Sequence, residues 1–168
     1  MAMTSPPKND SCQTVLEELS PEKRAAWIGF QRAHSLVMKA LEADLIANFG
    51  LQLSGFEVLS RVAAADEGKL RMSDLAEQAL LSQSRVSRLV TELERKGLMA
   101  RHGCETDTRV VYAAITDEGR KLLQQVRGHH VDSIEQRFFR GLSQQEIERL
   151  ADLWERVVET AVAPPAGA

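Results

Sequence analysis

The segment from Leu80 to Arg109 constrains the fold most, because it joins a helix with marked ends to the first part of a short wing-like hairpin. Ser82 can accept a hydrogen bond from a free amide of the first turn, and Gly97 can end the helix in a left-handed conformation. The apolar residues between these ends recur at i, i+3, i+4 and i+7 and are Val86, Leu89, Val90 and Leu93. This spacing predicts a helix that packs on a core through one face.

The opposite face of this helix is polar. It carries Ser84, Arg85, Ser87, Arg88, Thr91, Glu92 and Arg95. The short hydrogen-bonding side chains and two arginines gather in the N-terminal half, which is the half that recognition helices present to base edges in the major groove. Arginines at this spacing also occur on solvated helix faces, so the flanking segments have to support a DNA-binding interpretation.

The flanking segments predict further helices and a hairpin. Ser20 with Pro21 predicts a helix start, and the helical pattern continues to about Asn48. Ser54 and Glu57 form a potential capping box for a helix to about Ala65. A strand at 69–71 and a helix at 74–79, capped by Ser73, precede the helix that Ser82 begins, and this order predicts a helix-turn-helix.

Extended runs at 98–103 and 109–115, with a tip at 104–108, predict a β wing after that helix. Thr116 is expected to start a long helix that continues to about Phe139. A capping box of Ser143 and Glu146 is expected to start a last helix, which continues to about Ala161. The predicted fold is therefore mainly α: a winged helix-turn-helix with a two-stranded β wing, and long N- and C-terminal helices that form a dimerisation region. We assign flexible tails to 1–19 and 162–168, the dimerisation region to 20–53 and 117–161, and the winged helix-turn-helix to 54–116.

Composition and charge agree with such a protein. Of its 168 residues, 43% are hydrophobic and 27% charged, and no apolar run is long enough to cross a membrane. The N-terminus lacks the segments of a signal peptide, so we expect a cytoplasmic protein. The net charge is −3, but residues 84–109 carry six basic and four acidic side chains, so positive charge is concentrated where DNA contact is expected.

Together, the string LRMSDLAEQALLSQSRVSRLVTELERKGLMAR from Leu70 to Arg101, and Asp107-Thr-Arg109 followed by VVYAAITDEGR, resemble the MarR family of bacterial transcriptional regulators. The resemblance covers roughly residues 20–161. It implies a homodimer whose first and last two helices intertwine, with paired winged helices on palindromic double-stranded DNA. Members are commonly repressors that a small ligand or oxidation releases.

The resemblance also implies residue roles. Gln83, Ser84, Ser87 and Arg88 would face bases or phosphates in the major groove, and Arg109 would enter the minor groove. Asp107 would hold this arginine by charge-assisted hydrogen bonds, although the two could form an ordinary surface ion pair. With phosphate contacts included, the expected DNA-binding set is Ser54, Arg71, Ser82, Gln83, Ser84, Arg85, Ser87, Arg88, Asp107 and Arg109.

Other residues suggest weaker functional assignments. Trp27, Phe30 and His34 on the first helix either pack in a core or line a pocket for a small aromatic or amphipathic effector. We expect no cofactor and no metal, because the adjacent His129 and His130 point about 100° apart on a helix. Oxidation of Cys104 at the wing tip would place a new charge or crosslink beside DNA, but exposed cysteines are usually incidental, so redox sensing is the weaker alternative.

The residues contain no hydrolase, phosphate-loop or metalloprotease motif, so we expect no enzyme. The alternative to a DNA-binding regulator is a winged-helix docking module for another protein.

Overall fold

A computed structural model of the chain describes residues 16–103, 107 and 109–162. The chain divides into two units, one ending at Ala40 and the other beginning at Leu41. Most of the expected N-terminal tail, Cys12, Cys104 and residues 163–168 lie outside the described part.

The first unit contains a short 3₁₀ turn, Leu16–Glu18, and the N-terminal part of α2, Pro21–Phe49. Ser20 caps α2 as predicted, because its Oγ accepts a hydrogen bond from the backbone amide of Lys23 at 3.4 Å. The helix ends one residue beyond the predicted Asn48. Gly50 follows with a φ of 60°, which is the left-handed conformation that suits a glycine after a helix.

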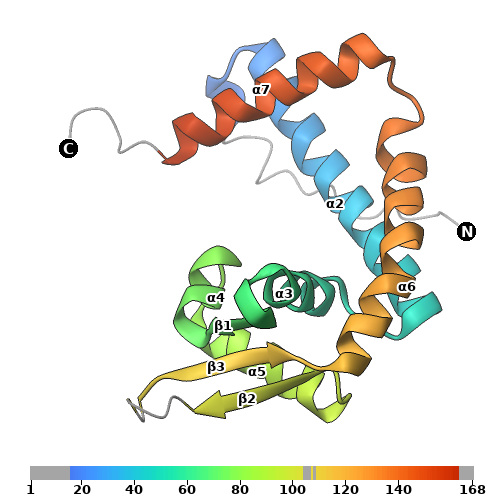
Figure 1. The fold of residues 1–168 in the computed structure, drawn as a ribbon. Coiled ribbons are helices and arrows are strands. Elements are labelled where there is room, and N and C mark those ends of the chain that lie inside the picture. The colour runs from blue at the N-terminus through green and yellow to red at the C-terminus, as the bar shows by residue number, and fades with distance from the viewer. Residues whose placement is uncertain (1–15, 104–106, 108, 163–168) are drawn as a thin grey trace, which may run out of the picture. The chain divides into compact units, whose positions relative to one another are not determined.

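The second unit contains the predicted helix-turn-helix and a sheet. Its elements are α3 (Leu53–Ala64), a 3₁₀ turn (Asp66–Gly68), β1 (Lys69–Arg71), α4 (Met72–Gln78), α5 (Gln83–Arg95), β2 (Met99–Gly103) and β3 (Val111–Ile115). The sheet is antiparallel in the order β1-β3-β2. β2 and β3 form the predicted hairpin, and β1 adds a third strand, with α3 and α4 packed over the sheet (Figure 1).

The hydrophobic core of this unit lies between the helices and the sheet. All four apolar residues predicted for α5 are buried, and Val86 and Val90 are completely inaccessible. They pack with Leu59 and Val62 of α3 and with Leu75 of α4. Burying this apolar face fixes which side of α5 points outward.

Both ends of α5 are as predicted. Ser82 is the N-cap, with its Oγ 3.3 Å from the amide nitrogen of Arg85. Gly97 has a φ of 70°, and the amide of Leu98 donates to the carbonyl of Leu93 at 2.9 Å, which closes a Schellman motif. Next to this end, Lys96 Nζ donates to the carbonyl of Gly50 at 2.6 Å.

Two predicted helix caps are wrong. α3 begins at Leu53 with Gln52 as N-cap, so Ser54 lies inside the first turn and forms no capping box with Glu57. α4 begins at Met72 with Arg71 as N-cap, and the hydroxyl of Ser73 instead donates to Asp74 Oδ1 at 2.9 Å. In addition, β3 begins at Val111, two residues after the predicted start.

The C-terminal helices are α6 (Asp117–Ile134) and α7 (Gln144–Val162). Thr116 caps α6 by accepting from the amide of Gly119 at 3.1 Å. The predicted helix to Phe139 is continuous, but its last segment, Glu135–Phe139, is a π-helical turn. The predicted capping box of α7 is present, because Glu146 accepts from the amide of Ser143 at 2.8 Å and donates its own amide to the Ser143 hydroxyl at 3.4 Å.

Candidate nucleic-acid interface

The apolar face of α5 packs in the core, so its polar face points outward. Gln83, Ser84, Arg85, Ser87 and Arg88 are all exposed. The hydroxyl oxygens of Ser82 and Ser84 lie 3.1 Å apart, so these two side chains are joined at the start of the helix. This N-terminal half combines neutral hydrogen-bonding groups with two arginines.

The wing carries an arginine held by a carboxylate. The backbone amide of Arg109 donates to Asp107 Oδ1 at 3.0 Å, its Nε donates to the same oxygen at 3.1 Å, and its Nη2 donates to Oδ2 at 3.3 Å. These hydrogen bonds hold the pKa of Asp107 below its ordinary value, so the carboxylate stays ionised. The Arg109 side chain remains 89% exposed, which leaves most of its guanidinium surface open to solvent.

A hollow of about 590 Å³ lies between the first half of α5 and the wing. Its described lining comprises Arg71, Met72, Ser73, Gln83, Ser84, Ser87, Arg101, Arg109, Val110 and Val111. Five residues of the predicted DNA-binding set are therefore brought together: Arg71, Gln83, Ser84, Ser87 and Arg109. Three arginines and no carboxylate occur among these lining residues. Two of the arginines are paired with carboxylates outside the lining, Arg109 with Asp107 and Arg101 with Glu94, so the hollow presents guanidinium N–H donors that suit an anionic partner.

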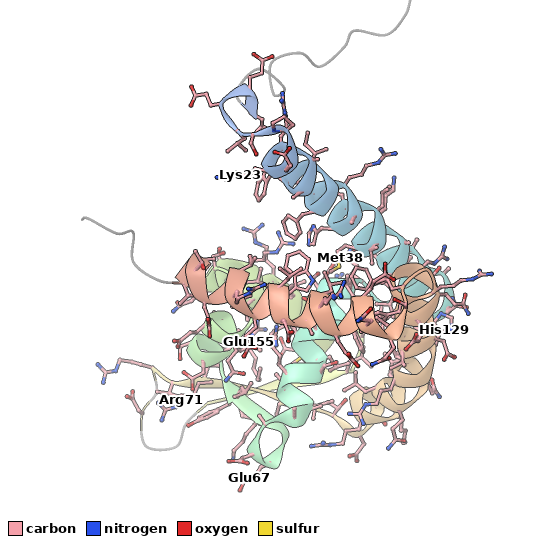
Figure 2. All side chains as sticks on the ribbon, turned by 90° about the horizontal axis from the view of Figure 1, so that it is seen from above. Lys23, Met38, Glu67, Arg71, His129 and Glu155 are labelled. Carbon is pink, nitrogen blue, oxygen red and sulfur yellow. The ribbon has the colours of Figure 1, made fainter. Side chains whose placement is uncertain are left out.

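Arg71 reaches the hollow from β1. Its Nε donates to the hydroxyl of Tyr112 at 3.2 Å, and its guanidinium carbon lies 5.9 Å from the centre of the Tyr112 ring. Residues 71 and 112 are paired across β1 and β3, so the sheet itself sets this contact. Figure 2 shows Arg71 and His129 at opposite ends of the view, so the hollow is remote from the α2–α6 contact around His129.

The other predicted residues do not line the hollow. Arg85 and Arg88 lie three residues apart on the exposed face of α5, and Ser82 is at its start. Asp107 holds the side chain of Arg109, which does line the hollow. Ser54 lies in the first turn of α3, where its backbone is part of the helix.

Sequence reasoning missed Arg101, which also lines the hollow. Arg101 lies on β2 and pairs with Glu94 of α5. In the sequence, Arg101 is marked only by an acidic residue, Glu94, seven positions earlier near the end of a helix. That spacing does not indicate a contact unless the turn at Gly97 is known.

The predicted effector residues form a short column of rings on α2. The ring centres of Trp27 and Phe30 are 5.8 Å apart, and those of Phe30 and His34 are 6.0 Å apart. Trp27 is 46% and Phe30 40% exposed within the described chain, so the rings present apolar surface.

The two adjacent histidines of α6 have separate partners. His129 lies 3.2 Å from the side-chain nitrogen of Asn48 and edge-on to Phe49, whereas His130 packs edge-on against Phe56. No cluster of three or more potential metal-ligating side chains occurs in the described parts of the chain. Likewise, no helix within residues 16–103 or 109–162 is long and apolar enough to cross a membrane.

Comparisons with known proteins identify the family. A profile of the MarR family matches residues 49–110. A Bacillus subtilis protein named HTH-type transcriptional regulator MhqR is 30% identical over 112 residues, which cover 67% of this chain and 75% of MhqR. The chain belongs to the MarR family of transcriptional regulators.

Solved structures of similar proteins share the fold. A regulator from Streptomyces coelicolor, solved in complex with DNA, is 30% identical with a TM-score of 0.81, covering 89% of this chain and 94% of its own. CouR from Rhodococcus jostii, solved with p-coumaroyl-CoA, is 27% identical with a TM-score of 0.65, covering 77% of this chain and 90% of its own. The predicted family and the predicted winged helix-turn-helix are thus confirmed.

Proposed function

We propose that this MarR family regulator acts as a homodimeric, ligand-responsive repressor that binds a palindromic operator in double-stranded DNA. The observation that carries the proposal is the hollow between α5 and the wing, where Arg71, Arg101 and Arg109 surround the outward face of a recognition helix. A major groove about 12 Å wide accepts a helix, and a flanking wing then meets the adjacent backbone or minor groove.

We assign roles by chemistry and position. Gln83, Ser84, Ser87 and Arg88 contact bases or phosphates in the major groove, because they lie on the exposed face of the first two turns of α5. Arg109 enters the minor groove, whose negative potential suits an exposed arginine. Asp107 holds the Arg109 side chain. The other four members of the set contact phosphates and fix the register; they are Ser54, Arg71, Ser82 and Arg85.

The outer helices bring a second subunit, and with it a second DNA-binding site, into the protein. Residues 84–109 carry a net charge of only +2, so one subunit has little bulk attraction for DNA. We assign dimerisation to 20–53 and 117–161. This assignment is supported by α7, which has no buried residue and exposes Leu153, Val157 and Val158 at 48%, 51% and 60%. Two linked copies gain affinity through a high effective concentration.

The ring column of Trp27, Phe30 and His34 is the proposed contact for a small aromatic or amphipathic effector. Stacking and apolar contact with these rings would bind the flat part of such a molecule. CouR, a relative of this chain, was solved with p-coumaroyl-CoA, which supports an aromatic ligand class for this part of the proposal. The proposal is a binding function in the cytoplasm and involves no catalytic step.

Selection of bound duplexes from random DNA, followed by fluorescence anisotropy at several salt concentrations, tests the proposal. We expect one palindromic sequence to be enriched and log Kd to change linearly with log salt, with a slope set by phosphate contacts. Arg88→Ala should weaken binding to the palindrome more than to random DNA, whereas Arg61→Ala on α3, which removes an exposed arginine outside the hollow, should change neither. Absence of bound duplex at low salt would favour the docking-module alternative.

A further inference from the structure

Arg101 attaches the wing to the recognition helix, and the Glu94 carboxylate holds both its backbone and its side chain. Its backbone amide donates to Glu94 Oε1 at 2.9 Å, and its Nη1 pairs with Glu94 Oε2. Both side chains are partly buried, with 27% and 28% of their surface exposed. Glu94 therefore fixes the position of the β2 backbone and the direction of the Arg101 side chain together.

The other end of the Arg101 guanidinium reaches the middle of α5. Nη2 lies 2.7 Å from the carbonyl oxygen of Ser87, 3.1 Å from Thr91 Oγ1 and 3.3 Å from Ser87 Oγ. Two N–H groups are thus shared among three acceptors. The Thr91 hydroxyl donates to the Ser87 carbonyl at 2.9 Å, so its proton is already used within the protein.

Ser87 differs from Thr91 because its hydroxyl proton is not used in a hydrogen bond to any described residue. Its Oγ accepts from a cationic donor, while no described residue accepts the Ser87 hydroxyl proton. A hydroxyl that accepts from a guanidinium is polarised, which makes it a stronger donor and a weaker acceptor. Because Ser87 lines the hollow, this proton is available to whatever occupies it.

We propose that Arg101 is a positioning residue that makes Ser87 a hydrogen-bond donor toward DNA. Ser87 then selects a base-pair edge that presents an acceptor in the major groove, such as purine N7, guanine O6 or thymine O4. It discriminates against the amino groups of cytosine and adenine. A serine without a neighbouring arginine can bond to a donor or an acceptor on a base edge. Arg101 on β2 therefore narrows the base specificity of Ser87 on α5. The inference rests on the proposed function.

The test uses the full chain and the palindromic duplex selected from random DNA by the wild-type protein. Single acceptors are weakened one position at a time with 7-deazapurines, 6-thioguanine and 4-thiothymine. We expect one position in each half-site at which an analogue weakens wild-type binding by about fivefold, the effect of losing one hydrogen bond. Ser87→Ala should bind the natural and substituted duplexes equally well at that position.

Arg101→Met should lose this sensitivity to the analogue although Ser87 is still present, which a purely structural role of Arg101 would not produce. Arg95→Met, which removes an exposed arginine from the same helix, should retain it. Thr91→Val is the second variant should Arg101→Met fail to fold, because it removes one contact that holds Arg101 beside Ser87. We expect it to reduce the analogue effect without abolishing binding.

The outcomes separate the two proposals. Failure of the wild-type protein to select any duplex would overturn the proposed function, and this inference with it. Selective binding in which no analogue position depends on Ser87, or in which the folded Arg101 variant keeps the full wild-type sensitivity, would overturn the inference alone.

Discussion

The hydroxyl of Thr116 donates a hydrogen bond to the carbonyl of Gly97 at 2.7 Å. Gly97 lies two residues before β2 and Thr116 directly follows β3, so this bond closes the base of the hairpin. The same oxygen accepts from the amide of Gly119 and starts α6. One side chain thus links the end of the recognition helix to the start of α6.

Thr116→Val should destabilise the fold by about 1–2 kcal/mol, because it removes an N-cap and a hydrogen bond while keeping the shape of the side chain. Thr116→Ser keeps both bonds and should lie within about 0.5 kcal/mol of the wild type. Urea denaturation of the two variants measures the difference, and equal stabilities would contradict the assigned role.

Leu80→Gly should stabilise the protein by about 0.5–1 kcal/mol, since a side chain in the left-handed region is strained. Leu80 has a φ of 54° and is 92% exposed, so its removal relieves strain and costs little packing. Leu80→Ala retains a Cβ and should give no such gain. Thermal unfolding of the two variants measures the difference in stability. The prediction fails if the Leu80→Gly protein is no more stable than the Leu80→Ala protein.

Arg109→Ala should weaken binding to the selected duplex by about 1–3 kcal/mol at fixed salt, the usual cost of losing an arginine contact to DNA. Its unfolding free energy should stay nearly constant, because the side chain is 89% exposed. Arg61→Ala on α3 removes an exposed arginine outside the hollow and should leave Kd unchanged. An unaltered Kd for Arg109→Ala would eliminate the wing contact.

Protonation of His130 should destabilise the fold at mildly acidic pH. Burial lowers the pKa of His130, although Glu57 opposes this shift, and its Nδ1 is buried without a partner among the described residues. The unfolded chain therefore takes up the proton first, and stability falls as the pH drops below about 6.5. His130→Leu should reduce the loss of thermal stability between pH 7 and pH 5.5. His102→Gln, which alters an exposed histidine, should show the wild-type loss.

Val157→Asp should convert the proposed homodimer to monomers, because it places a charge in the exposed apolar stripe of α7. Glu155→Gln changes charge on the polar side of the same helix and should preserve the dimer. Sedimentation velocity at micromolar concentration separates the two species. A dimeric Val157→Asp protein would exclude this stripe from the interface.

Locally encoded features were predictable from the sequence. The caps of α2, α5 and α7 depend on residues within three or four positions, and the apolar face of α5 follows from its spacing. The caps at Ser54 and Ser73 failed because tertiary contacts overrode the local signals. Buried Leu51 anchors the chain just before α3, and pairing of Arg71 with Tyr112 keeps the backbone extended until α4 begins at Met72.

The unpredicted features join distant segments. The pairing of β1 with β3 brings together residues about forty positions apart, and it carries Arg71 into the hollow. Arg101 reaches Ser87 only because the turn at Gly97 folds β2 back along α5. The exposed, strained Leu80 was also missed, since its conformation depends on how α4 and α5 are joined.

The contact between Lys96 and Gly50 limits how α5 can move. A helix rises 1.5 Å per residue, so the flexible Lys96 side chain can follow a shift of α5 by one residue, but a larger shift breaks its hydrogen bond to the Gly50 carbonyl unless Gly50 moves as well. The C-terminal end of the recognition helix is thus tethered to the point where α2 stops. Large axial displacements of the DNA-facing end are therefore opposed at that junction.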